Sequence, residues 1–310
     1  MTLTDMRYLV ALAAELHFGR AAEACHVSQP TLSVAIKKLE DQLGVILFER
    51  SAGEVRITAV GEAVVAQAQR VLNEAVRLKE VARAGRDPLA GPLRLGAIYT
   101  IGPYLLPHLI PLLHERAPQM PLLIQENYTH MLAELLKRGE LDVAILALPF
   151  DEPGLVAQPL YDEPFRVLVP AGHPWTARTA IAPVDLASEP MLLLGAGNCF
   201  REQVLEVCPQ CGTGQSDAQG LPKSLEGSSL ETIRHMVATG AGVTVLPSAA
   251  ADPLAADGRL VKVLPFAEPE PSRRVVLVWR SSFPRAKAID VLRHAVFDSA
   301  LPGVRPVTAR

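Results

Sequence analysis

The sequence predicts an α/β protein made of an N-terminal helical unit with a short wing, a long helix, and two α/β lobes. Three observations predict this fold class. The 310 residues exceed the usual length of one domain, helical periodicity dominates residues 1–58, and short apolar runs alternate with helical stretches after residue 92. We therefore expect a helical unit at 1–58, a long helix and hinge at 59–87, and the two lobes at 88–310.

The composition excludes several classes of protein. Hydrophobic residues make up 49% of the chain and charged residues 20%, so most of the chain can fold around packed cores. The formal charge of −3 argues against a polycationic or membrane-adsorbing protein, and no apolar run approaches the ~20 residues of a membrane helix. Charged residues interrupt the apolar N-terminal stretch, so we expect no export signal. Four cysteines are too few for a disulfide scaffold, which favours a cytoplasmic, mostly reduced location.

Within the helical unit, one helix has an apolar face and a polar face. Ser28 is a good N-cap for this helix, and its first turn tolerates Pro30. Helical spacing predicts a buried stripe that consists of Leu32, Ala35, Ile36, Leu39 and Leu43. The opposite face carries Gln29, Thr31, Ser33, Val34 and Lys37. That face can contact base edges and phosphates in a major groove, or it can simply be solvated. Residues 20–56 carry five basic and five acidic groups, so charge does not decide between the alternatives.

A long helical pattern follows from Thr58 to Ala84 and carries a heptad seam. The seam consists of Val64, Ala68, Val71, Ala75, Leu78 and Ala82. It predicts pairing with a second copy of the chain, and the alternative is a helix that packs on its own domain. Glycines and prolines at residues 85–92 predict a hinge after this helix.

Beyond the hinge, short apolar runs alternate with helical stretches, as in βαβ units. The expected strands are 93–97, 121–126, 141–148, 165–169, Met191–Leu194, 243–246 and 275–279. The expected helices are 104–116, 131–138, Leu230–Ala238 and Ala286–Phe297. This pattern predicts mainly parallel sheets, and about 220 residues suit two lobes better than one.

Cys199 lies where a helix is expected to begin, after a strand and a glycine-rich turn. Asn198 is the expected N-cap, and Arg201 places a cation nearby. The free N–H groups and positive dipole end of a helix N-terminus favour the thiolate, the reactive form of cysteine. The alternative is a small buried hydrophobic residue.

Cys208 follows nine residues later, and about 13.5 Å of helical rise would separate it from Cys199. A disulfide requires Cα atoms within about 7 Å, so these two cysteines can join only if the helix unwinds. Cys208 and Cys211 form a CxxC pair, which leaves open a disulfide between them or a resolving role for Cys211. No second Cys/His pair with ligand spacing follows, so we expect neither a metal nor another cofactor. Cys25 is expected in the core of the helical unit.

Six segments of residues 16–61 resemble the LysR-type transcriptional regulators. They are 16–22, 27–33, 36–40, 43–45, 47–50 and 58–61. The resemblance implies a winged helix-turn-helix DNA-binding domain, a dimerisation helix, and a regulatory domain whose two lobes are similar to periplasmic binding proteins. It implies a DNA-contacting set of Gln29, Pro30, Thr31, Ser33, Lys37, Arg50 and Arg56, with the two arginines near the wing and the phosphates.

The segments around Cys199, 229–238, 242–247 and 269–274 resemble the hydrogen-peroxide-sensing branch of that family. The resemblance implies that peroxide binds near Thr100, Thr129 and Cys199, oxidises Cys199 to a sulfenic acid, and that Cys208 then forms a disulfide with Cys199. The arginines of 269–274 are expected near this pocket. Two departures are Asn198, where the branch usually has histidine, and the additional Cys211.

The resemblance also implies the partners of the chain. They are an operator in double-stranded DNA, hydrogen peroxide, a second copy in a dimer and further copies in a tetramer on DNA, RNA polymerase, and a glutaredoxin- or thioredoxin-like reductant. We expect a cytoplasmic activator that is not an enzyme and has no membrane partner. The alternatives are a LysR-type regulator that senses a small metabolite between the lobes with structural cysteines, a solute-binding protein, and a thiol peroxidase.

Overall fold

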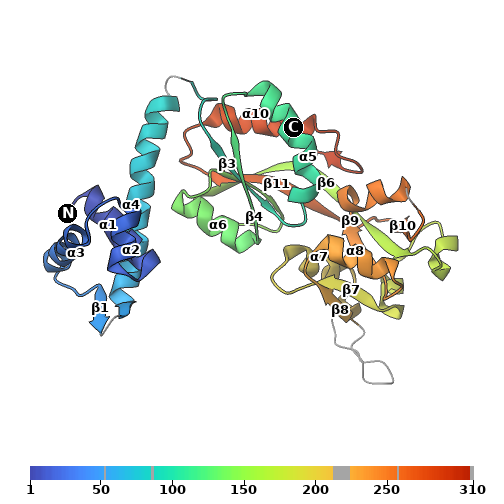
Figure 1. Cartoon of the computed structure of the whole chain (residues 1–310). Coiled ribbons are helices and arrows are strands. Elements are labelled where there is room, and N and C mark those ends of the chain that lie inside the picture. The colour runs from blue at the N-terminus through green and yellow to red at the C-terminus, as the bar shows by residue number, and fades with distance from the viewer. Residues whose placement is uncertain (52–53, 85–86, 212–223, 257, 308–310) are drawn as a thin grey trace. The chain divides into compact units, whose positions relative to one another are not determined.

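The computed structural model describes the whole chain except residues 52–53, 85–86, 212–223, 257 and 308–310. The chain divides into two compact units, Met1–Arg86 and Asp87–Arg310. Each unit is coloured along the chain in Figure 1. None of the described helices combines the length and the apolar character that a membrane span needs.

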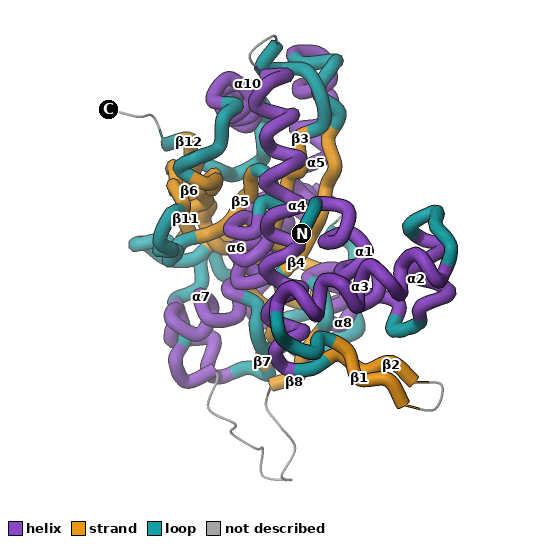
Figure 2. The backbone as a smooth tube through the Cα atoms, turned by 90° about the vertical axis from the view of Figure 1, so that its left-hand side faces the viewer, coloured by secondary structure: helices purple, strands orange, loops and turns teal. Residues whose placement is uncertain are grey.

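The first unit is a winged helix-turn-helix followed by one long helix. Its elements are α1 (Leu3–Glu15), α2 (Phe18–Ala24), α3 (Gln29–Leu43), β1 (Phe48–Ser51), β2 (Glu54–Ile57) and α4 (Ala59–Ala84). The strands β1 and β2 pair antiparallel as the predicted wing, and Figure 2 shows this hairpin in orange. The core is built mainly from α1, α2 and α3, and Ala68 of α4 packs into it.

Side-chain caps explain where the helices begin. The Ser28 hydroxyl accepts from the backbone N–H of Thr31, and the Thr58 hydroxyl accepts from that of Gly61 at 2.9 Å. Gly61 is required at its position because a Cβ there would overlap the carbonyl oxygen of Leu47. The carboxylate of Glu40 in α3 accepts from the N–H of Leu47, at 2.8 Å, and so ties α3 to the start of the wing.

The predicted apolar stripe of α3 is buried in its central part. Leu32, Ile36 and Leu39 are buried, whereas Ala35 is half-buried. Leu43 is 38% exposed, so its predicted burial is wrong. The reason is that Leu43 ends the helix, where Gly44 turns the chain into the left-handed region and away from the core.

The second unit is organised around an eight-stranded mixed sheet. Its strands are β3 (Leu93–Ile98), β4 (Leu122–Asn127), β5 (Val143–Ala147), β6 (Leu155–Pro170), β9 (Thr244–Pro247), β10 (Val261–Pro265), β11 (Ser272–Arg280) and β12 (Arg305–Pro306). The strand order is β10-β6-β11-β5-β3-β4, and β9 and β12 also pair with β6. Two further strands, β7 (Met191–Leu194) and β8 (Ser224–Gly227), form a separate parallel pair.

The prediction of mainly parallel sheets is wrong for the strands that connect the lobes. β3 pairs parallel with β4 and β5, whereas β11 pairs antiparallel with β5 and β6, and β6 pairs antiparallel with β9 and β10. The physical reason is that β6 runs out of one lobe into the other and β11 returns, so the two lie side by side in opposite directions. The short strands β8, β10 and β12 were not expected from the sequence.

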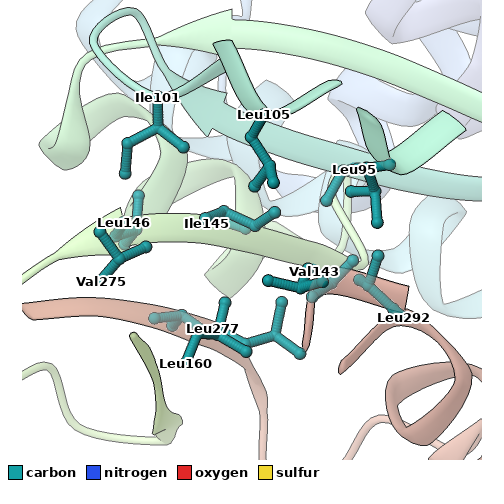
Figure 3. Close-up of a cluster of buried hydrophobic side chains, with 14 of the residues drawn as sticks. Leu95, Ile101, Leu105, Val143, Ile145, Leu146, Leu160, Val275, Leu277 and Leu292 are labelled. Atoms are coloured by element: carbon teal, nitrogen blue, oxygen red, sulfur yellow. The ribbon is translucent and has the colours of Figure 1, made fainter. Parts of the chain in front are cut away.

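Helices cover the sheet and define two lobes with separate cores. The first lobe contains α5 (Gly102–Arg116), α6 (Thr129–Arg138) and α10 (Ala286–Phe297), and the second contains α7 (Cys199–Val207), α8 (Leu230–Ala238) and α9 (Ser248–Ala251). Short 3-10 helices are η1 (Pro174–Ala177), η2 (Pro183–Ser188), η3 (Pro209–Cys211) and η4 (Asp252–Ala256). Figure 3 shows the first-lobe core, where Ile145 of β5 and Leu277 of β11 lie among side chains from α5 and α10. The second-lobe core includes Phe165, Phe200 and Val204.

Candidate functional site

Cys199 is the first residue of α7 and lies where the two lobes meet. Phe200 and Val204 of the same helix are buried in the second-lobe core, whereas Cys199 is half-buried and packs against the first-lobe core. Asn198 takes the N-cap position, as predicted, but its side chain does not cap the helix. Instead its amide nitrogen donates to the carbonyl of Gly195, at 2.9 Å, and so closes the turn before Cys199.

A small cavity lies beside Cys199. Three segments line it, one from each of the loops at the ends of β3, β4 and β7: Ile98, Tyr99 and Thr100; Asn127, Tyr128 and Thr129; and Gly197, Asn198 and Cys199. Its volume is about 10 Å³, which is enough for about one water-sized molecule. The structure therefore brings Thr100, Thr129 and Cys199 together around this small space.

The Thr100 hydroxyl is held by a buried ion pair. Arg273 donates to the Thr100 hydroxyl at 2.7 Å and to the Thr100 carbonyl at 2.8 Å, and it donates to the carboxylate of Glu163 at 2.8 Å. Arg273 is 3% exposed and Glu163 is 1% exposed. Because the threonine oxygen already accepts from arginine, its own proton remains available to donate. The guanidinium carbon also lies 5.1 Å from the centre of the Phe200 ring, next to Cys199 in sequence.

The Thr129 hydroxyl forms no hydrogen bond with the described residues. Thr129 is the first residue of α6, and its oxygen is buried with no hydrogen-bond partner among the described residues. Buried polar groups are normally paired, so this hydroxyl can still form a hydrogen bond with a small polar molecule. The Tyr128 ring packs edge-on against Tyr99, at 5.4 Å between centroids, and both tyrosines help line the cavity.

Two of the cations near the site do not reach the cavity. Arg201, expected beside Cys199, donates instead to the carbonyl of Leu194 at 2.7 Å and pairs with Glu226 at 2.9 Å. Arg274 pairs with Asp162 at 2.7 Å, and this contact holds the pKa of the Asp162 carboxyl below its usual value. Of the two arginines in the 269–274 segment, therefore, only Arg273 contacts a residue that lines the cavity.

Cys208 is at the opposite end of α7 and is bonded to Cys211. The two Cα atoms are 5.5 Å apart, and Cys199 is a free thiol. The expected Cys199–Cys208 disulfide is therefore absent from this structure, and the alternative CxxC pairing is present. The physical reason is that the nine-residue helix keeps Cys199 and Cys208 about 13.5 Å apart along its axis.

A second hollow of about 450 Å³ lies between the lobes, and its lining includes Leu148, Gln203 and Arg274. Among the described residues, no cluster of three or more histidine, cysteine, aspartate or glutamate side chains could hold a metal ion. Glu163 and the two tyrosines of the cavity wall were missed in the sequence. Glu163 lies inside β6, two residues before the apolar run expected at 165–169, and a buried acidic residue there could have been suspected from that position.

The predicted DNA face of α3 is mostly exposed. Gln29, Pro30, Thr31 and Lys37 are exposed, and Val34 on the same face is 68% exposed. Ser33 is half-buried, and Arg56 on β2 is exposed. The side chain of Arg50 lies outside the part of the chain that the structure describes.

A winged helix-turn-helix and a two-lobed α/β domain with a small cavity beside a thiol define a DNA-binding regulator with a sensing domain. The profile of the bacterial regulatory helix-turn-helix proteins of the lysR family matches residues 3–62. The profile of the LysR substrate binding domain matches residues 86–300. The chain belongs to the LysR family.

Within this family the chain is similar to proteins named OxyR. The OxyR of Escherichia coli K12, a DNA-binding transcriptional dual regulator, is 43% identical over 96% of this chain and 95% of its own length. The hydrogen peroxide-inducible genes activator of Haemophilus influenzae is 39% identical over 98% of this chain and 100% of its own length.

Solved structures lead to the same group of proteins. Full-length OxyR C199D from Pseudomonas aeruginosa matches with a TM-score of 0.76 and 53% identity, covering 100% of this chain and 99% of that one. A hydrogen-peroxide-bound cysteine-to-serine mutant of Corynebacterium glutamicum OxyR matches with a TM-score of 0.63 and 33% identity, covering 96% and 92%.

Proposed function

We propose that this chain is a peroxide-sensing, DNA-binding transcription regulator in which hydrogen peroxide enters the small cavity and oxidises Cys199. One observation carries the proposal: Thr129, whose hydroxyl is buried and has no hydrogen-bond partner among the described residues, lines a cavity of about 10 Å³ together with Cys199. Hydrogen peroxide is small enough for this cavity, and it can both donate and accept hydrogen bonds. Relatives named as hydrogen peroxide-inducible genes activators support the same function.

The oxidation uses groups that the cavity already positions. The Cys199 thiolate attacks one peroxide oxygen, the O–O bond breaks, and the other oxygen leaves and takes a proton to become water. Cys199 is then a sulfenic acid. Cys199 attacks from the first turn of α7, and the hydroxyls of Thr100 and Thr129 can orient peroxide for that attack.

We propose that the response continues with attack of Cys208 on the sulfenic acid, which releases a second water and forms the Cys199–Cys208 disulfide. This step requires reduced Cys208 and loss of α7. Unwinding exposes side chains such as Phe200 and Val204, at a cost of about 1.5–3 kcal/mol each. Because Cys199 packs on the first lobe and these side chains on the second, the event also shifts one lobe against the other. A hydrogen bond between Tyr104 of α5 and Glu231 of α8, at 3.2 Å, is one contact that such a shift would break.

DNA recognition is assigned to the first unit. The exposed face of α3 enters the major groove, where Gln29, Pro30, Thr31 and Ser33 meet base edges and the cations Lys37, Arg50 and Arg56 meet phosphates.

Pairing of two chains is assigned to α4. Val64 and Ala68 pack into the chain's own core, whereas Leu78, farther along the same seam, is 73% exposed. A partner's α4 can cover Leu78 and the half-buried seam residues Val71 and Ala75. Two dimers on one operator form the tetramer.

The remaining partners follow from the regulatory role. An activator contacts RNA polymerase, and a glutaredoxin- or thioredoxin-like protein of the cytoplasm restores the thiols. Each signal needs one oxidation event and no turnover, so we propose that the chain is not an enzyme.

The direct test combines trapping of the sulfenic acid with DNA binding. Full-length Cys208→Ser protein is treated with one equivalent of peroxide and then with a cyclic dione that labels sulfenic acids. Cys199 should carry the label. The double variant, with Cys199→Ser as well as Cys208→Ser, should carry none. The protein with all native cysteines, reduced first, should change its gel-shift pattern on an operator fragment after the same treatment. An unlabelled Cys199 and an unchanged gel shift would contradict the proposal. They would favour a regulator that senses a metabolite in the larger hollow between the lobes.

A further inference from the structure

Cys208 and Cys211 lie at the end of α7 and are joined by a disulfide in this structure. The backbone N–H of Cys208 closes the last turn of α7 by donating to Val204, and Pro209 cannot continue the helix because it lacks an N–H. The chain turns into the 3-10 helix η3 instead, where the N–H of Cys211 donates to the carbonyl of Cys208 at 3.0 Å. This turn brings the two sulfurs together as a disulfide.

The two cysteines of this pair differ in burial. Cys208 is 1% exposed and belongs to the second-lobe core, whereas Cys211 is half-buried. Only two residues separate them, so Cys211 stays close to Cys208 whether α7 is folded or unwound. Cys199, by contrast, can approach Cys208 only in the unwound state.

Two disulfides therefore compete for the single sulfur of Cys208, and they have opposite effects on the fold. The Cys199–Cys208 bond excludes α7. The Cys208–Cys211 bond coexists with an intact α7, with Cys199 as a free thiol at its first position. The protein keeps α7 packed only when Cys208 is bonded to Cys211.

We propose that Cys211 resets the peroxide switch by taking Cys208 from Cys199 in an intramolecular thiol–disulfide exchange. The Cys211 thiolate, having lost its proton to solvent, attacks the sulfur of Cys208. The Cys199–Cys208 bond breaks, and Cys199 leaves as a thiolate at a position that becomes a helix N-terminus again. Together with the oxidation steps above, one hydrogen peroxide and the thiols of Cys208 and Cys211 yield two waters and the Cys208–Cys211 disulfide.

The exchange limits each response to a pulse. α7 refolds while the oxidising equivalents remain stored in the CxxC pair. Cys208 is then unavailable, so a further peroxide at Cys199 stops at the sulfenic acid until a reductant opens the Cys208–Cys211 bond. This inference rests on the proposed oxidation of Cys199 by peroxide and adds the step that ends the signal.

The test follows the disulfides of the fully reduced, full-length protein over time after one equivalent of hydrogen peroxide. Samples are quenched with an alkylating agent, and the pairings are mapped by mass spectrometry. We expect Cys199–Cys208 to appear first and then to give way to Cys208–Cys211 with an alkylatable Cys199. In Cys211→Ser, Cys199–Cys208 should persist at least about tenfold longer, because no neighbouring thiol can displace Cys199. Cys25→Ser is the matched control, and it should reproduce the native time course because Cys25 lies in the first unit.

Hydrogen exchange of the α7 amides provides a second readout. Protection should be lost and then regained in the native protein, and lost without recovery in Cys211→Ser. A Cys199–Cys208 bond that is equally persistent in both proteins would overturn the exchange. Formation of Cys208–Cys211 at an unchanged rate in Cys199→Ser would also overturn it, because the pair would then be oxidised directly. Absence of any Cys199 oxidation even in Cys211→Ser would instead reject the proposed function, and the exchange with it.

Discussion

The guanidinium of Arg273 lies 2.7 Å from the hydroxyl of Thr100, and this hydrogen bond joins a buried ion pair to the wall of the Cys199 cavity. Arg273 comes from β11, whereas Glu163, its ionic partner, comes from the point where β6 passes between the lobes. Glu163 also accepts from the backbone N–H of Ala249 in α9, at 3.1 Å. One arginine therefore couples the cavity to the connection between the lobes.

The first prediction concerns this ion pair. Arg273→Met should lower the free energy of unfolding of the second unit by about 3–5 kcal/mol, because it leaves the Glu163 carboxylate buried without a counter-charge. Adding Glu163→Gln should recover part of the loss, since glutamine can still accept from Ala249. Both tryptophans, Trp175 and Trp279, lie in the second unit, so denaturant unfolding followed by tryptophan fluorescence reports this unit alone. Equal stability of the single and double variants would contradict the prediction.

The second prediction separates binding of peroxide from reactivity of the thiol. Thr129→Val should slow oxidation of Cys199 by about tenfold, the equivalent of one lost hydrogen bond, and leave alkylation by iodoacetamide nearly unchanged. Thr129→Ser keeps the hydroxyl and is the matched control. Thr100→Val should slow oxidation as well, but it also removes the bond from Arg273 and so lowers stability. If oxidation and alkylation slow equally, the threonines act on the thiol or the fold.

The third prediction addresses α3. Lys37→Ala should weaken DNA binding on all sequences and reduce the slope of log affinity against log salt by about one, because one phosphate contact is lost. Gln29→Ala should instead relax the preference for the operator over other sequences. Gel-shift titrations at several salt concentrations measure both effects. The assignment of this face to DNA fails if neither variant differs from the native protein.

The fourth prediction addresses the part of the α4 seam from Val71 to Leu78. Replacing Val71 and Leu78 by glutamate should place like charges across the helix pair and shift the protein from dimer to monomer. Gln67→Glu, at an exposed position of the same helix, is the control for added charge. Sedimentation measures the oligomeric state. A dimer that survives the double substitution would mean that the second unit holds the chains together.

The fifth prediction is a pH dependence. Partial burial raises the pKa of Glu126, which directly precedes the cavity-lining Asn127, above its ordinary value of 4.5. The folded state therefore binds this proton more tightly than the unfolded state, so ionisation of Glu126 costs stability as the pH rises above 4.5. Glu126→Gln should stabilise the second unit at neutral pH, by a modest amount because the side chain is partly solvated, and the gain should disappear toward pH 4. Thermal unfolding followed by tryptophan fluorescence across this range measures the difference.

Much of the secondary structure follows from local patterns. The ranges Met191–Leu194, Leu230–Ala238 and Ala286–Phe297 are predicted to the residue, because buried elements with regular apolar spacing carry their signal in a short window. The antiparallel pairing of β6 with β11 does not follow from local patterns. Pairing between residues far apart in the chain depends on where the chain crosses between the lobes.

For the candidate site, the sequence by itself determined that Cys199 begins a helix and that this helix separates it from Cys208, since both depend on nearest neighbours and helical geometry. The juxtaposition of Thr100, Thr129 and Cys199 was expected only from family resemblance, and the tertiary structure decided it by bringing three loop ends together. The tertiary structure also decided that Arg273 rather than Arg201 serves this cavity and that Glu163 balances its charge. Charges are buried or exposed, and paired or not, according to contacts between distant segments, and no local pattern of residues contains that information.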